Sequence, residues 1–433
     1  MNGQRDATGP RLLVLSSLFP SDAQPGAGLF IRERMFRVAQ RVPIVVVAPQ
    51  PWFPLQGLIR RFRPHFRPMA QGYELMRGIE VHRPRFLCFP GILKWTDGLF
   101  MALASYTTVR RLVRRHSLNL LDVHFGYPDG AAGRLLSRWL RLPMVLTLRG
   151  KEERQSRMSV AGPLKHAVRS ADQIVTVSGA LGDVAVRLGA DRRRVTHVGN
   201  GVDLGKFTPV PREQARADLQ LPPDARVLVS VGTLVERKGF HRVIECLPEL
   251  LQRHPGLHYL AVGGAGPEGD MSAKLRALVA ELGLTERVHF LGAYPPERLR
   301  GPLSAADVFV LATSYEGWAN AFLEAMACGL PVVTTRVGGN AEVICTPKLG
   351  TLVGFGNRAA LTATLDEALS RHWDREHIIE HARENSWDRR IPQLLAVYER
   401  ALNRAVPEME GRGAASAEHP RGSQESRIEA QNS

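Results

Sequence analysis

Short apolar segments alternate with helix-like segments along the whole chain, and this alternation constrains the fold most strongly. The apolar segments of the first half are 11–16, 43–49, 79–85, 120–126, 143–150, 171–178 and 194–203. Those of the second half are 225–232, 257–263, 288–292, 306–313 and 331–335. Strands that alternate with helices, twice over, predict an α/β fold in which two doubly wound, Rossmann-like parallel sheets face a central cleft.

The length of 433 residues leaves room for two domains, each with its own core. We predict an N-terminal, acceptor-side domain over 1–195 and a C-terminal, donor-side domain over 196–387. We expect the chain to cross between them near 190–210 and 385–390, and the last helix, 388–405, to pack back on the first domain. Residues 406–433 are rich in Gly, Ser, Glu and Arg, which predicts a disordered tail.

The net charge of +15 is concentrated in the first half of the chain. Residues 1–200 hold 31 Lys and Arg against 13 Asp and Glu, whereas residues 201–433 hold 26 against 29. A basic half suits nucleic acid, an anionic membrane surface or an acidic ligand. No nucleic-acid-binding motif is present, so we expect no nucleic-acid partner. An Arg-rich composition without a binding role explains the excess as well as membrane contact does.

Segment 52–72 mixes aromatic and aliphatic residues with arginines, which favours contact with anionic lipid headgroups. Its prolines forbid a long helix, so packing over the core is the competing interpretation. The start of the chain has no signal-peptide pattern, and the four cysteines are widely spaced. We therefore expect a cytoplasmic protein without disulfides, with peripheral contact at the inner face of the plasma membrane as a hypothesis.

The stretch 316–344 combines two carboxylates, an Ala-rich helix and a glycine loop. Glu316 precedes the helix and Glu324 lies within it. A helix that begins after a glycine directs unpaired backbone N–H groups toward the preceding loop, where a phosphate fits. Arg237 and Lys238, in a loop after a strand, are adjacent cations that suit a diphosphate, although solvated surface charge is the commoner role.

The first half offers weaker candidates. Gly26 and Gly28 follow the first strand, where a Gly-x-Gly pair is more often a plain surface turn. His124 ends a strand at the edge where ligands bind in such sheets. Asp129 precedes a helix, which favours an N-cap. Since no nucleophile elbow, phosphate-binding Walker loop or metal-binding histidine pair is present, the residues alone predict a two-domain enzyme that binds a phosphate-bearing ligand.

The stretch 316–344 resembles the signature of the family-4 retaining glycosyltransferases, also called group 1, which have the GT-B fold. GTLVERKG, VHFLGAYPPERL, SAADVFVLAT and VGNGVDLGKFTP resemble further motifs of this family in the same order. HFGYPDGAA and LTLRGKE resemble, more loosely, enzymes of bacterial teichuronic acid and exopolysaccharide biosynthesis. The likeness extends from the loop at Gly26 to the last helix.

The resemblance implies roles for individual residues. It assigns the donor sugar to Glu316, the ribose to Glu324 and the diphosphate to Lys238. Gly26 and Gly28 match the loop that closes over the donor phosphate and meets the acceptor. Backbone N–H groups would hold sugar and diphosphate, and 288–291 would border the base. The donor-binding set is Gly26, Gly28, Arg237, Lys238, Glu316, Gly317, Trp318, Ala319, Asn320, Ala321 and Glu324.

The chain departs from the family pattern at two points. Many relatives have an arginine where this chain has Thr233, so Arg237 is the substitute we expect. Many also have a histidine at the end of the strand that here finishes with Arg149, which leaves His124 and Arg149 as catalytic candidates. The resemblance implies no cofactor and no metal, a UDP- or GDP-sugar donor, and a polysaccharide or lipid-linked acceptor. Alternatives are a nucleotide-sugar epimerase on the same fold and a catalytically inactive partner subunit.

Overall fold

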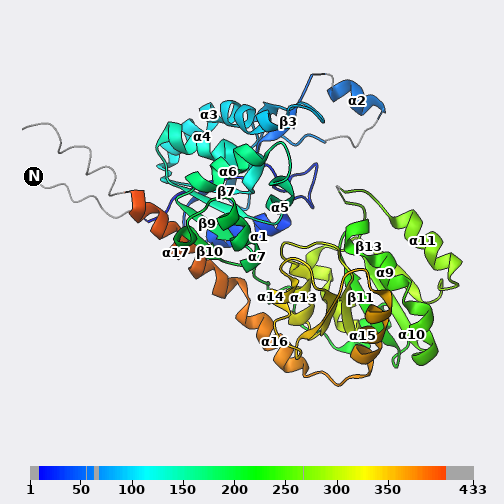
Figure 1. Ribbon diagram of the computed structural model, residues 1–433. Coiled ribbons are helices and arrows are strands. Elements are labelled where there is room, and N and C mark those ends of the chain that lie inside the picture. Colours follow the sequence, from blue (N-terminus) through cyan, green and yellow to red (C-terminus); the bar gives the residue numbers. More distant parts are fainter. Residues whose placement is uncertain (1–8, 55, 63–67, 267, 406–433) are drawn as a thin grey trace, which may run out of the picture.

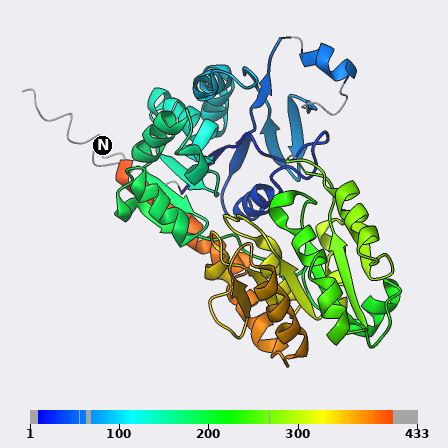
Figure 2. The same ribbon diagram turned by 45° about the vertical axis from the view of Figure 1, so that its right-hand side comes forward.

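The computed structural model describes residues 9–54, 56–62, 68–266 and 268–405. It contains two α/β domains, each built on its own central sheet (Figure 1). The predicted tail 406–433 lies outside the described residues. In a second view, α1 (Leu29–Val38) of the first domain lies between the two sheets, beside the second domain (Figure 2).

The first domain has an eight-stranded sheet in which seven strands are parallel. The eighth, β4, pairs antiparallel with β5 at one edge, so this sheet is mixed where a purely parallel one was predicted. In spatial order the strands are β10 (Val195–His197), β9 (Gln173–Thr176), β8 (Met144–Leu148), β7 (Leu120–His124), β1 (Leu12–Leu15), β2 (Ile44–Val47), β5 (Ile79–His82) and β4 (Tyr73–Met76). A separate parallel pair joins β3 (Gln50–Trp52) to β6 (Arg85–Leu87).

Helices cover both faces of the first sheet because successive strand residues point to opposite sides. Leu13 and Leu15 of β1 belong to the core under α3, α4, α6 and α7. Leu12 and Val14 belong to the core under α1 and α17. The helices of this domain after α1 are α2 (Gln56–Phe62), α3 (Asp97–His116), α4 (Ala131–Leu140), α5 (Glu152–Gln155), α6 (Ala161–Ser170) and α7 (Gly179–Arg187).

The second domain has six parallel strands around one apolar core. In spatial order they are β13 (Val288–Gly292), β12 (Leu257–Val262), β11 (Arg226–Val231), β14 (Val308–Leu311), β15 (Val332–Thr335) and β16 (Gly350–Val353). Its helices are α8 (Arg212–Asp218), α9 (Phe240–Ile244), α10 (Leu247–Arg253), α11 (Ser272–Glu281), α12 (Arg300–Ala305), α13 (Asn320–Ala327), α14 (Asn340–Val343), α15 (Arg358–Ser370) and α16 (Arg375–Glu384).

The two segments that cross between the domains are hydrogen-bonded to each other. The N–H of Val202 donates to the carbonyl of Asn385 at 3.1 Å, and the N–H of Trp387 donates to the carbonyl of Val202 at 3.2 Å. The predicted boundary between 195 and 196 falls inside β10, which pairs with β9, so the first domain extends to Val198. The last helix, α17 (Trp387–Ala405), buries Tyr398 and other apolar residues against the first sheet.

Candidate active site

Glu316 is the centre of a cluster of charges at the carboxyl end of β14. It is 7% exposed, and its Oε1 accepts from Lys238 Nζ at 2.5 Å and from Arg237 at 3.0 Å. The hydroxyl of Thr313 adds a third, longer hydrogen bond at 3.3 Å. Removing a carboxylate from water is costly unless cations and donors surround it, and this one has both. Three predicted donor-side residues are therefore in direct contact.

The two cations of this cluster differ in how tightly they are bound. Arg237 also pairs with Glu268 at 2.9 Å and donates to the carbonyl of Tyr315, so it bridges three acceptors. The ammonium of Lys238 contacts Glu316 alone among the carboxylates that the structure describes. An ammonium on a flexible stem can leave one anion for another more easily than a guanidinium fixed at several points. Lys238 is thus the cation best able to move to a bound phosphate.

The N-terminus of α13 supplies unpaired donors beside this cluster. Within the described part of the chain, no acceptor meets the backbone N–H groups of residues 318–321. The first turn of a helix carries a partial positive charge, so these groups and Lys238 present a positive field. Trp318 itself packs against Gly199 and the ring of His197, and its Nε1 is buried without a partner among the described residues. The contribution of these N–H groups to donor binding stays a prediction.

Glu324 is a half-buried carboxyl on the second turn of α13. No hydrogen bond or ion pair joins its side chain to any residue that the structure describes. Burial raises its pKa to about 7, although Lys206 and Lys238 act in the opposite direction. A half-buried carboxyl without partners among the described residues can accept hydrogen bonds from a ligand. Two vicinal hydroxyls are donors that would suit it.

The domains touch directly beside the cluster, at Gly150 and Gly317. A Cβ on Gly317 would lie 2.6 Å from the carbonyl oxygen of Arg149, so no larger residue fits without movement. The hydroxyl of Tyr315 donates to the carbonyl of Gly150. Further along, Glu342 of α14 accepts from the N–H groups of Gly179 at 2.6 Å and Ala180 at 3.1 Å, at the start of α7. These contacts join the two domains beside the cluster.

The two glycines after β1 differ in their surroundings. Gly28 begins α1 with a φ of 69°, and a Cβ there would lie 2.4 Å from the carbonyl oxygen of Leu18. Gly26 is exposed and has nothing near its Cβ position. Only at Gly28 do the backbone conformation and its surroundings therefore require a glycine. Neither contacts the Glu316 cluster in this arrangement, and their predicted role in donor binding stays a prediction.

His124 and Arg149 meet on the first domain's side of the cleft. His124 is fully buried, and its Nδ1 lies 2.8 Å from one terminal nitrogen of Arg149. Its Nε2 lies 3.3 Å from the carboxylate of Asp122. Because guanidinium N–H groups only donate, Nδ1 accepts and the ring proton lies on Nε2. Burial lowers the pKa of His124 to about 4, so the ring is neutral at physiological pH.

A buried polar network extends from this pair in both directions. Asp122 accepts from the hydroxyl of Tyr398 at 2.8 Å, which ties the network to α17. Asn200 accepts from Arg149 at 3.3 Å and from Arg34 at 3.1 Å, and its amide donates to Asn320 at 3.0 Å. Asn320 is the first residue of α13. Asn200 therefore connects the histidine–arginine pair to the helix that carries Glu324.

The sequence interpretation missed several members of this network. Asn200 lies within the VGNGVD motif, whose asparagine was the available signal. Arg34 and Tyr398 carry no local signal, because each finds its partner far along the chain. Asp122 is two residues from His124 on the same strand, and its other partner, Tyr398, is distant. Asp129 is not an N-cap, since its carboxylate accepts from the N–H and hydroxyl of Ser17. Burial raises the pKa of Asp129 to about 6.

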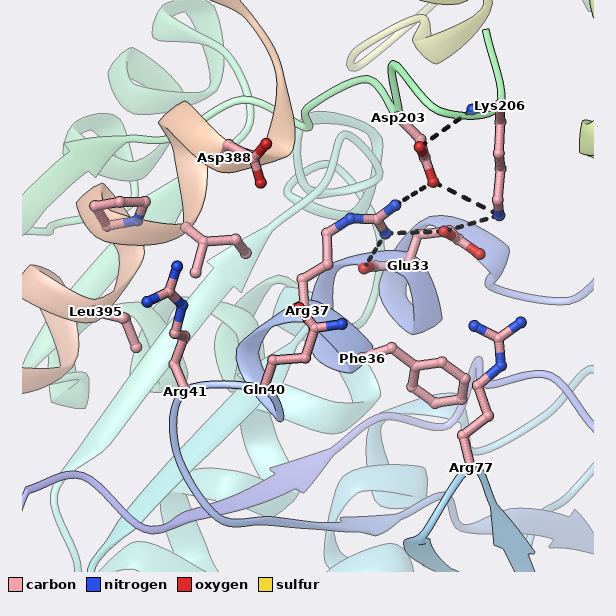
Figure 3. Close-up of a pocket in the computed structure, with 12 residues that line it drawn as sticks. Glu33, Phe36, Arg37, Gln40, Arg41, Arg77, Asp203, Lys206, Asp388 and Leu395 are labelled. Carbon is pink, nitrogen blue, oxygen red and sulfur yellow. Dashed lines mark hydrogen bonds and ion pairs between the residues drawn. The ribbon is translucent and has the colours of Figure 1, made fainter.

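A hollow of about 520 Å³ lies outside the predicted site, between α1, α17 and the crossing segment (Figure 3). Arg37 pairs there with Glu33 at 2.9 Å and with Asp203, while Lys206 pairs with Glu33 at 3.2 Å. Burial favours the neutral form of Glu33, but these two cations outweigh it and lower its pKa to about 2. Lys206 also pairs with Glu297 of the second domain at 3.3 Å, so this cluster joins the domains.

The described residues contain no group of three or more His, Cys, Asp or Glu side chains arranged to hold a metal ion. Among the same residues, no helix is both long and apolar enough to span a bilayer.

Comparisons with known proteins agree with this architecture. Residues 211–385 match the family model for glycosyl transferases group 1, and residues 39–206 match that for glycosyltransferase family 4. TuaC of Bacillus subtilis, assigned to teichuronic acid biosynthesis, is 32% identical over 76% of this chain and 82% of its own. A D-inositol 3-phosphate glycosyltransferase of Corynebacterium urealyticum is 31% identical over 92% of this chain and 94% of its own.

Solved structures show the same fold at low identity. Sucrose-phosphate synthase of Thermosynechococcus elongatus matches with a TM-score of 0.64 and 21% identity, over 94% of this chain and all of its own. HepE of Anabaena, solved with UDP, matches with a TM-score of 0.61 and 19% identity, over 93% of this chain and all of its own. The family resemblance and the fold predicted from the sequence are both confirmed. The chain belongs to the group 1, family-4 glycosyltransferases and is a glycosyltransferase with the GT-B fold.

Proposed function

We propose that this enzyme transfers a sugar, with retention of configuration, from a nucleotide-sugar donor to a polysaccharide or lipid-linked acceptor in cell-surface glycan synthesis. The observation that carries the proposal is the cluster at α13. Lys238 and Arg237 contact Glu316, unpaired N–H groups lie beside them, and Glu324 has no partner in the part of the chain that the structure describes. A diphosphate, a sugar and a ribose together would use each of these groups.

Donor binding rearranges the charge cluster in this proposal. The diphosphate takes Lys238 and the helix N–H groups, and Glu316 then has free lone pairs for hydroxyls of the sugar. Glu324 accepts hydrogen bonds from the ribose. Gly26, Gly28 and Arg237 complete the donor side, with no metal required because cations and helix N–H groups neutralise the diphosphate. The solved HepE complexes, one with UDP and another with UDP-glucose, support a UDP-sugar among the donors to test first.

The acceptor hydroxyl attacks C1 of the sugar on the face from which the nucleotide leaves. Its proton passes to the departing diphosphate, and the positive field of the cluster stabilises the charge that grows there. Closure of the domains excludes water and brings the two substrates together. Arg149 reaches toward this space from the first domain, and His124 orients it. Glu316 and Glu324 bind the donor in this scheme and form no covalent intermediate.

A donor screen tests the proposal. Purified enzyme is incubated with UDP- and GDP-sugars, with and without a bacterial glycan acceptor, and release of nucleoside diphosphate is measured. We expect release from one donor class that increases with acceptor, and an α-linked product from an α-linked donor. Conversion of the donor to an epimer without acceptor would replace the transferase proposal with the epimerase. No release from any donor would favour an inactive partner subunit.

The basic first half supports peripheral contact with the cytoplasmic membrane surface, where a lipid-linked acceptor would be found. This location is part of the proposal.

A further inference from the structure

The outer side of α3 and the loop before it expose a row of large apolar side chains. Ile92 is 64% exposed, Trp95 55% and Leu103 54%, and Leu99 is also exposed. Leu99 and Leu103 are four residues apart and form one stripe along α3, and Trp95 lies in the short turn that precedes the helix. Soluble monomers rarely leave so many large apolar side chains together in water. We call these residues and Leu93 the apolar face.

Leu93 adds an independent sign that this face has a use. Its backbone adopts a φ of 48°, in the left-handed region that disfavours leucine, yet its side chain is exposed. Asparagine or glycine would fit this backbone with less strain, and no burial compensates for the leucine. Helix α2 of the same domain also exposes an aromatic side chain, since Phe62 is 80% exposed.

The same stripe of α3 becomes cationic toward its C-terminus. Arg110, Arg111 and Arg114 are exposed and have no ion pair among the described residues. Arg115 has only a 3.8 Å contact with Glu80. The one acidic residue of α3, Asp97, is buried. One helix therefore presents apolar side chains at one end and unpaired guanidinium groups at the other.

We propose that the apolar face and these arginines dock the enzyme on an anionic phospholipid bilayer. The apolar side chains enter the level of the headgroups and upper acyl chains, and the guanidinium groups bind lipid phosphates. Charge complementarity favours lipid over a protein partner, because Arg110, Arg111 and Arg114 lack carboxylates among the described residues and every anionic lipid supplies a phosphate. Peripheral contact was expected from composition at 52–72, where residues 55 and 63–67 lie outside the described structure, and the structure assigns a further surface to 92–115.

The position of this surface suits the proposed reaction. Both α2 and α3 lie on the side of the first domain away from the second domain (Figure 1). Docking through them leaves the donor domain clear of the bilayer and free to exchange nucleotide. The inference rests on the proposed lipid-linked acceptor for its purpose, but its observations are independent of donor chemistry.

Vesicle flotation with the full-length protein tests the inference. We expect wild type to float with vesicles of phosphatidylcholine and phosphatidylglycerol, and to remain at the bottom with phosphatidylcholine alone. Raising the salt concentration should reduce flotation severalfold, because screening weakens the arginine–phosphate contacts. A variant with Ile92→Ser, Trp95→Ser and Leu99→Ser should lose most of its binding at any salt. One with Arg110→Gln, Arg111→Gln and Arg114→Gln should lose the difference between the two vesicle types.

Matched controls separate docking from general damage. Phe355→Ser removes an exposed aromatic ring from the second domain and should leave flotation unchanged. Leu93→Asn should raise the melting temperature by relieving backbone strain while it lowers flotation, a combination that a purely structural leucine would not give. Binding of nucleoside diphosphate, measured by calorimetry, should be equal in all these variants. A loss of flotation with intact nucleotide binding is thus distinct from failure of the proposed donor site.

Two outcomes would overturn the inference. Wild type that stays at the bottom with phosphatidylglycerol vesicles at low salt would exclude lipid docking. Equal flotation of wild type and the triple serine variant would exclude this face as the surface. If light scattering shows a dimer that the serine variant abolishes, without vesicle binding by either, the face belongs to a contact between two copies of the chain.

Discussion

The two sides of the cleft are built on different principles. On the donor side, Glu316, Lys238 and Glu324 come from short motifs and keep unused bonding capacity. On the acceptor side, His124 and Arg149 are joined to Asp122, Asn200 and other residues in one buried network. The donor side is therefore ready for a ligand, whereas the acceptor side holds its reactive groups in a fixed position.

This difference suggests that donor-side residues bind the donor, whereas acceptor-side residues position the reactive groups. A ligand that enters the donor side replaces ion pairs that already exist, so donor-side substitutions should act on affinity and chemistry together. In the described structure, the acceptor-side network is hydrogen-bonded to α13 through Asn200 and Asn320. Substitutions there should lower turnover while they leave donor affinity unchanged.

The largest effect should follow Lys238→Ala. The variant loses the cation that we assign to the diphosphate and leaves Glu316 with Arg237 and a hydroxyl. We expect kcat/KM to fall by ~100- to 1,000-fold, as when a preorganised group that stabilises developing charge is removed. Diphosphate release measures this, and Lys274→Ala, an exposed lysine of α11 without an ion pair in the described structure, is the matched control. Near-normal activity would show that the donor side is not where the phosphate binds.

Arg149→Met should give the next largest effect. In this variant His124 Nδ1 and the side-chain oxygen of Asn200 each lose the hydrogen bond that Arg149 donates, in a buried setting. Loss of such charged hydrogen bonds is worth ~1.5–3 kcal/mol, so we expect kcat to fall by about 10- to 100-fold. The donor KM should stay within about twofold, because no donor-side group moves. A rise in donor KM with unchanged kcat would contradict the division between binding and positioning.

The same division explains what the sequence could predict. Glu316, Lys238 and Glu324 were predictable because each lies in a local pattern, a strand end or a helix start, whose geometry is set by neighbours in the chain. The hydrogen bond between Tyr398 and Asp122 joins residues 276 positions apart, and no local pattern encodes it. A structure was needed to find it.

Local sequence patterns likewise decided which strands and helices could be predicted. Buried strands such as β1 and β14 are continuous apolar runs and were predicted within two residues. The edge strands β4 and β16 were missed, because β4 is largely exposed and β16 begins with Gly350 and is only partly buried. Helix α2 lies in the segment 52–72, whose mixed composition gave no period, and residues 55 and 63–67 of that segment lie outside the described structure.

Glu324→Gln should raise stability while it weakens donor binding. The folded-state pKa of this carboxyl is about 7 against 4.5 for the free group, so folding disfavours its ionised form. Below pH 4.5 wild type and variant should differ little. Between pH 4.5 and 7 the unfolded wild type loses its proton first, so its free energy of unfolding falls by ~1–3 kcal/mol relative to the variant. Chemical denaturation across pH measures this.

Parallel stability curves for the two proteins would contradict the raised pKa of Glu324. Donor binding tests the second half of the prediction. An amide accepts at one oxygen where a carboxylate accepts at two, so we expect nucleotide affinity above pH 7 to fall by roughly tenfold, equivalent to one or two hydrogen bonds.

The smallest effect should follow the removal of a buried tyrosine hydroxyl. The test compares such a hydroxyl in the acceptor-side network with one in the core of the second domain. Tyr398→Phe removes a buried hydroxyl that donates to Asp122 at 2.8 Å, and Tyr259→Phe removes one that donates to Ser230 at the same distance in the second domain. Each should lower the free energy of unfolding by ~1–2 kcal/mol. Only Tyr398→Phe should also lower kcat, by about threefold, because Asp122 holds His124 and His124 holds Arg149. If both variants change stability alike and neither changes kcat, the network stabilises the first domain without positioning its reactive groups.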